Sequence, residues 1–181
     1  MPDSDLETHG REKRRSLREA VLGSYRDEYK ELGDAWRGLE TKAQGTVAIA
    51  GIFLAGAFAY IREISAQTSL GQKLLLVCAI VCLVTSVCLS VLALEVRRVA
   101  APLVAGRVDQ LVKDLLAVAD DNEFLDRLPD FYSDQAAAWR EVNQQSHEAN
   151  QSKARRVWNA QGFLLAAIIL VALLLLARVF S

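Results

Sequence analysis

Histidine and cysteine are scarce in this chain, and their positions argue against the usual metal and disulfide sites. The two histidines are His9, in a charged N-terminal stretch, and His147, which has no ligand partner at metal-binding spacing. All three cysteines, Cys78, Cys82 and Cys88, lie in one apolar run. An apolar run of this kind can lie inside a bilayer, where an odd, clustered set of cysteines has no oxidising partner. We therefore expect small packing residues there, with no metal site and no cofactor.

Sequence signatures of catalysis are also missing. The chain has no glycine-rich phosphate loop, no GxSxG and no HExxH. No local arrangement of serine, histidine and aspartate suggests an activated nucleophile. The formal net charge of -1 does not suggest nucleic acid as a partner. We therefore expect a protein that is neither an enzyme nor a nucleic-acid binder.

What the chain has in quantity is apolar sequence, gathered into three long runs. Residues 45–61, 74–94 and 157–177 carry no charge. The third run has two polar amide side chains near its start, Asn159 and Gln161. A helix needs about 20 predominantly apolar residues to cross the hydrocarbon core of a bilayer. Too little amphipathic chain remains to cover three such runs in a soluble fold. The sequence predicts an all-α integral membrane protein with three transmembrane helices and long amphipathic cytosolic helices.

The distribution of Arg and Lys predicts the orientation of these spans. Positive residues are more frequent before the first run and between the second and third runs than on the opposite side, and such residues stay in the cytoplasm. We expect four parts: a cytosolic helix at 1–44, a transmembrane hairpin at 45–95, a cytosolic helical region at 96–156, and a third span with a short outward tail at 157–181. The first span then serves as an uncleaved anchor. The arginine-rich and alanine-rich composition suggests a bacterial inner membrane.

Small residues recur every four positions in the first two spans, a spacing that lets helix backbones approach closely in lipid. The row in the first span comprises Gly51, Ala55 and Ala59. The row in the second span comprises Cys78, Cys82, Ser86 and Ser90. The two rows are predicted either to pack on each other within one hairpin, or to pack between subunits or line a narrow pore.

A heptad pattern precedes the first span. Apolar residues alternate at spacings of three and four, with charged residues between them, as in a coiled coil. The seam comprises Leu22, Tyr25, Tyr29, Leu32, Trp36 and Leu39. This helix is predicted either to pack on other cytosolic helices of the same chain or to form a coiled coil between subunits.

The region between the second and third spans is predicted to hold three helical pieces. Pro102 is expected to begin a helix with an apolar stripe that ends near Val118. A short apolar element then ends at Pro129, and Ser133 caps a long helix toward the third span. The middle of that helix, residues 143–151, is polar all round. Such a stretch crosses solvent or lies along a partner.

The sequence at the start of the first span resembles a known group of small bacterial membrane proteins. Glu40, Lys42 and Ala43 stand where a cytosolic helix meets the first span. This pattern is similar to that of the transmembrane effectors of Pycsar antiphage systems and of SLATT-domain proteins, over residues 25–98. The resemblance implies regulated oligomerisation, membrane disruption and growth arrest of an infected cell. The third span departs from a simple two-span effector, and Lys42 also has the ordinary role of a boundary lysine whose ammonium reaches the interface.

Three functions are consistent with these features. The first is an oligomeric inner-membrane effector or pore-type module of antiphage defence. The second is a membrane-anchored scaffold that recruits a cytosolic partner, and the third is a phage-derived holin or superinfection-exclusion protein. No span has an ionisable residue in its middle, which argues against a pump or coupled transporter. The expected partners are the lipid bilayer, further copies of the chain, and a cytosolic protein or nucleotide-signalling partner.

Overall fold

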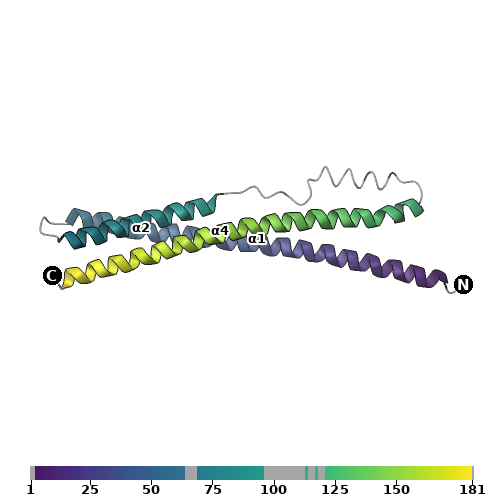
Figure 1. The fold of residues 1–181 in the computed structure, drawn as a ribbon, viewed down its shortest axis with the longest axis horizontal. Helices are drawn as coiled ribbons and strands as arrows, with labels where there is room; N and C mark the ends of the chain where they lie inside the picture. Colours follow the sequence, from purple (N-terminus) through teal and green to yellow (C-terminus); the bar gives the residue numbers. More distant parts are fainter. Residues whose placement is uncertain (1–2, 64–68, 96–112, 114–116, 118–120, 181) are drawn as a thin grey trace. The chain divides into compact units, whose positions relative to one another are not determined.

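The described part of the chain is helical. The computed structural model describes residues 3–63, 69–95, 113, 117 and 121–180. They form three helices, α1 (Asp3–Glu63), α2 (Leu70–Leu94) and α4 (Asp121–Val179), and these ranges contain no strand (Figure 1). The prediction of an all-α chain is confirmed. The helix expected from Pro102 to Val118 lies outside the described residues, apart from Lys113 and Ala117.

Each of the three helices contains a stretch long and apolar enough to cross a membrane, which confirms the three predicted spans. Between the first two spans the helices extend beyond the uncharged runs 45–61 and 74–94, because Arg62 belongs to α1 and Lys73 to α2. Helix α2 begins early because the Ser69 hydroxyl caps it, accepting a hydrogen bond from the amide of Gln72 at 3.3 Å.

The predicted break near Pro129 is wrong, because α4 runs through this proline without interruption. Proline has a backbone φ that suits a helix, but inside a helix it lacks the N–H that would bond to the carbonyl of residue i−4, and its ring crowds that carbonyl. Pro129 and Tyr132 line a groove together with Leu17 and Val21 of α1. Ser133 is therefore inside the helix rather than at its N-cap.

The contacts divide the chain into two compact units. The flank unit comprises Met1–Asp34 and Arg98–Ala149, and the span unit comprises Ala35–Arg97 and Asn150–Ser181. Each unit contains part of α1 and part of α4, while α2 belongs to the span unit. The domain boundaries expected at 44/45 and 156/157 therefore fall inside continuous helices.

The span unit has three layers of buried side chains along its length. The first contains Ala43, Ala93 and Val157. The middle layer contains Ala50, Leu83, Leu164 and Ala167. The third contains Ala57, Leu76 and Leu174. Residue numbers rise along the layers in α1 and α4 and fall in α2, so α1 and α4 are parallel and α2 is antiparallel to both.

The spacing of small residues explains this packing. The buried residues of α2 are Leu76, Ala79, Leu83, Ser86, Ser90 and Ala93, at alternating intervals of three and four. In α1, Ala43, Ala50 and Ala57 recur every seven residues. A seven-residue repeat keeps one face of a helix against its neighbours, and alanine lets the backbones come close. Large residues such as Phe58 point outward.

The flank unit pairs α1 with α4 through aromatic and polar contacts. Tyr29 and Trp139 meet edge to face, with ring centroids 5.7 Å apart. Asn143 donates hydrogen bonds to the carbonyl oxygen of Tyr25 at 3.0 Å and to the carboxylate of Glu28 at 2.8 Å. The polar stretch 143–151 therefore places Asn143 against α1 of the same chain, and Ser146 is also buried.

Truncating the middle layer should destabilise the span unit. Leu83→Ala leaves a cavity where the side chain is wholly buried, so we expect the free energy of unfolding to fall by about 2–5 kcal/mol. Unfolding of the purified chain in mixed detergent micelles, followed by circular dichroism, measures this loss. The control is Val84→Ala, next along α2 but exposed. Equal losses in the two variants would show that the middle layer is not closely packed.

Candidate functional site

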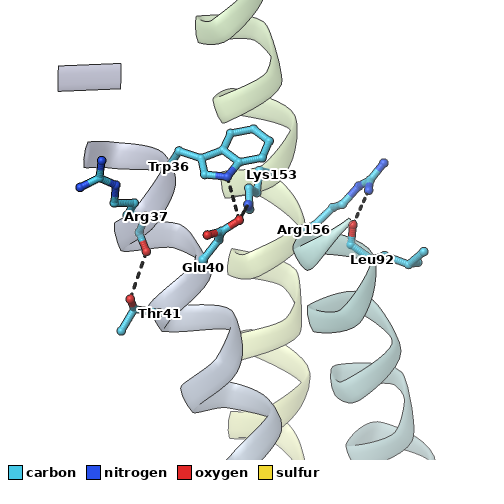
Figure 2. Close-up of polar contacts among 7 residues, drawn as sticks. All are labelled: Trp36, Arg37, Glu40, Thr41, Leu92, Lys153 and Arg156. Carbon is cyan, nitrogen blue, oxygen red and sulfur yellow. Dashed lines mark hydrogen bonds and ion pairs between the residues drawn. The ribbon is translucent and has the colours of Figure 1, made fainter. Parts of the chain in front are cut away.

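A buried lysine joins α1 to α4 at the start of the spans. The Lys153 ammonium donates a hydrogen bond to the Glu40 carboxylate at 2.8 Å and lies 3.6 Å from the centre of the Trp36 ring. The Trp36 indole N–H donates to the same carboxylate oxygen at 2.7 Å. Figure 2 shows the two α1 side chains turned toward Lys153 of α4. We call these three residues the clasp.

The clasp gives the lysine the two things that a buried cation requires. The side chain of Lys153 is only 4% exposed, whereas that of Glu40 is 32% exposed. An unpaired ion in such a position costs several kcal/mol, which a counter-charge and further favourable contacts offset. Here Glu40 supplies the charge, and the face of the Trp36 ring supplies a cation–π contact. The lysine therefore depends on its partners more than the glutamate does.

The electrostatics of Glu40 follow from the same contacts. The hydrogen bond from Lys153 is the main cause that lowers the pKa of the Glu40 carboxyl below its ordinary value. Burial opposes this effect, while the Trp36 hydrogen bond and the charge of Lys153 add to it. The folded chain therefore favours the ionised form of Glu40.

A second cation of α4, one turn further on, reaches α2. Arg156 donates a hydrogen bond to the carbonyl oxygen of Leu92 at 2.7 Å (Figure 2). Its guanidinium also lies 3.9 Å from the carboxylate of Glu95. The last carbonyl groups of a helix lack helical partners and carry partial negative charge, which a cation stabilises. Lys153 and Arg156 thus connect α4 to both other helices at one end of the span unit.

Hydroxyl groups form further polar contacts in the span unit, between the clasp and the middle layer. The Ser86 hydroxyl donates a buried hydrogen bond to the carbonyl oxygen of Ala160 at 2.7 Å, which joins α2 to α4. Thr46 is also buried, and its hydroxyl donates to the carbonyl oxygen of Lys42 in its own helix. Ser90 is buried, and its hydroxyl has no hydrogen-bond partner among the described residues. The middle layer, by contrast, is a cluster of apolar side chains.

Aromatic residues and cations mark the two ends of the third span. Trp158 is 77% exposed and follows Arg155 and Arg156, as expected of a tryptophan at a membrane–water interface. Near the other end of α4, the Arg178 guanidinium lies 5.1 Å from the centre of the Tyr60 ring of α1. Both ends thus have the residue types that anchor a span at the two surfaces of a bilayer.

The two predicted small-residue rows differ in their burial. Gly51, Ala55 and Ala59 are all exposed, so this row does not pack on the described parts of α2 and α4. In the second row, by contrast, Ser86 and Ser90 are buried, Cys82 is half-buried and Cys78 is exposed. The prediction that the two rows pack on each other is therefore wrong. The chain uses a different face of α1, the one with an alanine every seven residues.

The predicted heptad seam is on the inner side of α1 in both units. Leu22 is buried, and the other members are half-buried: Tyr25, Tyr29, Leu32, Trp36 and Leu39. In the single chain this seam faces the chain's own helices, and the coiled coil between subunits stays a prediction. Lys42, predicted at the membrane boundary, is exposed.

The role of Lys153 was missed in the sequence. A signal was available, because the buried positions of the third span, Val157, Ala160, Leu164 and Ala167, alternate at three and four residues. Extending this spacing backward by four residues reaches Lys153. The lysine therefore occupies a seam position, where a charged residue needs a partner.

Removing the two charges of the clasp should have unequal effects. Glu40→Ala leaves the Lys153 ammonium buried without a counter-charge, so we expect it to lower the free energy of unfolding by about 3–5 kcal/mol. Lys153→Met removes the charge and keeps an apolar chain of similar length, and should change stability by about 1 kcal/mol or less. Detergent-based unfolding measures both, and Asp27→Ala, which breaks an exposed ion pair with Lys30, is the control. A larger loss in Lys153→Met than in Glu40→Ala would contradict this account.

The clasp should also make stability depend on pH. Because the pKa of Glu40 is lowered in the folded chain, its contribution is present above the ordinary glutamate pKa of about 4.3 and is lost as pH falls through the lowered value. Melting temperatures of the purified chain should therefore fall at acidic pH. Glu40→Gln should show a smaller fall over the same range, since the glutamine cannot be protonated. Identical acid profiles of the two proteins would rule out this contribution.

Comparison with known proteins adds no relative. No family model matches the chain, and neither a curated protein nor a solved structure matches it. Its function is therefore inferred from its own residues, among which the clasp, the closed apolar layers and the exposed row on α1 are the most informative.

Proposed function

We propose that the chain is an oligomeric effector of the bacterial inner membrane that perturbs membrane integrity when it is activated, in defence against phage. The observation that carries the proposal is the row Gly51, Ala55 and Ala59, which is exposed on α1. A methyl group added at Gly51 would meet no atom of the other described helices within 4 Å. In lipid, small residues at four-residue spacing favour close approach of another helix. Because the contacts within the chain use another face, this row is available to a second copy.

The closed core supports assembly rather than a pore within one chain. Leu83 and Ala167 are wholly buried in the middle layer, together with Ala50 and Leu164. These four apolar side chains fill the middle of the span unit among the described residues. In the proposed function, ions therefore pass between copies of the chain or through lipid that the protein disturbs.

The proposed orientation places the clasp end in the cytoplasm. Lys42, Arg155 and Arg156 lie at that end, and cytoplasmic segments of membrane proteins carry an excess of positive residues. The same end contains Glu40 and Ala43, which belong to the resemblance with antiphage effectors. In this chain Glu40 forms the clasp and Ala43 is wholly buried in the first layer. Both residues thus have a structural role where the first span begins.

Membrane potential in bacteria that express the chain tests this function. A voltage-sensitive dye should report depolarisation after induction, alone or together with the neighbouring genes. Gly51→Leu should abolish depolarisation while the protein still inserts, because the leucine blocks close approach at the exposed row. Gly162→Leu is the matched control, since Gly162 is also exposed in an apolar stretch with nothing within 4 Å.

Loss of depolarisation in both variants would mean that bulk on any span, rather than the row on α1, is harmful. No depolarisation by the unaltered chain in either context would refute the effector function. In that case a membrane-anchored scaffold is favoured, and the exposed polar residues of α4 are the surface to test for a partner. These include Gln144, Gln145, His147 and Glu148.

A further inference from the structure

The end of the span unit at the clasp has little apolar contact of its own. Its layer contains two alanines, Ala43 and Ala93, and one valine, Val157, with Leu39 and Leu94 partly buried beside them. The middle layer contains two buried leucines and several large neighbours. Because the energy of apolar contacts grows with the buried area, the contact of α1 with α4 at this end depends more on polar interactions.

The polar interaction between α1 and α4 at this end has an unusual asymmetry. The Lys153 ammonium is almost wholly enclosed, and its carboxylate partner in the described residues is Glu40, which is partly open to solvent. Separating the two leaves the lysine charge buried between helices, where it cannot stay. The lysine then has to move toward water, and this requires α4 to turn or to separate from α1 near Val157.

We propose that the ion pair of Glu40 and Lys153 is an autoinhibitory contact that holds the start of the spans closed. This regulatory role rests on the proposed effector function. With the ion pair in place, the seam residues Leu39 and Ala43 are covered by the chain's own helices. When it breaks, this end of α1 opens, while the middle and far layers keep the rest of the span unit together.

Cysteine cross-linking in membranes tests the contact directly. The three native cysteines are first changed to alanine. The pair Ala43→Cys with Val157→Cys then reports the clasp end, and the pair Ala57→Cys with Leu174→Cys reports the far layer. Glu40→Lys and Lys153→Glu are introduced into each, alone and together. Lys30→Glu is the control, since it reverses an exposed charge in the same helix.

Each single reversal should slow cross-linking at the clasp end about tenfold, because two like charges cannot share the buried position. The far pair should be unchanged, which also shows that the variants are folded. The double reversal should restore cross-linking because it recreates an ion pair, and Lys30→Glu should have no effect. If a reversal abolishes cross-linking at the far pair as well, Glu40→Gln replaces it as the milder change. Unchanged cross-linking at the clasp end, or no recovery in the double reversal, overturns the proposal.

Membrane potential measured in the same cells separates this proposal from the proposed function. Single reversals should depolarise cells more strongly than the unaltered chain, and the double reversal should return to its level. If the unaltered chain depolarises cells and the single reversals do not exceed it, autoinhibition alone is overturned. If cross-linking follows the charges but no variant depolarises cells, the effector function is overturned, and autoinhibition with it.

Discussion

Close approach of the three helices is the constraint on which the span unit depends. In lipid, an apolar side chain gains nothing by leaving the hydrocarbon, so helices associate through packing and hydrogen bonds. Alanines at intervals of seven provide that packing in α1 and set which faces turn inward. The hydrogen bond from Ser86 to the carbonyl oxygen of Ala160 requires the same closeness, because a serine side chain is short. Larger residues such as Phe58 are consequently left for the lipid.

At the clasp, α1 and α4 are held together mainly by electrostatic interactions rather than by apolar packing. The buried face of α4 continues from Val157 back to Lys153, so the spacing that buries apolar residues in the span also buries a charge at its start. Glu40 and Trp36 compensate that charge from α1. Buried polar residues at such positions are known to specify the register of paired helices at some cost in stability. An apolar residue at position 153 would also hold the helices together, but it would specify their register less strictly than Lys153 does.

Sequence patterns predicted the composition-driven features of this chain and missed those that depend on distant partners. The three spans followed from long uncharged runs, and the inward face of α1 in the flank unit followed from its heptads. The small-residue row was assigned to the wrong face, because Gly51 and Ala55 at four-residue spacing look as suitable as Ala43 and Ala50 at seven. Only the positions of α2 and α4 distinguish the two. The counter-charge of Lys153 lies 113 positions away, beyond any local pattern.

The spacing of the interfacial residues on α4 sets a hydrophobic length for the protein. Trp158 and Arg178 are separated by 20 positions of one uninterrupted helix, a rise of about 30 Å, which is the thickness of an average hydrocarbon core. A helix has almost no freedom to shorten. A thinner bilayer must therefore be met by tilting or by local thickening of the lipid around the protein. Because the length of the third span is fixed, a change in lipid composition that alters bilayer thickness changes the tilt of this helix or the thickness of the lipid around it.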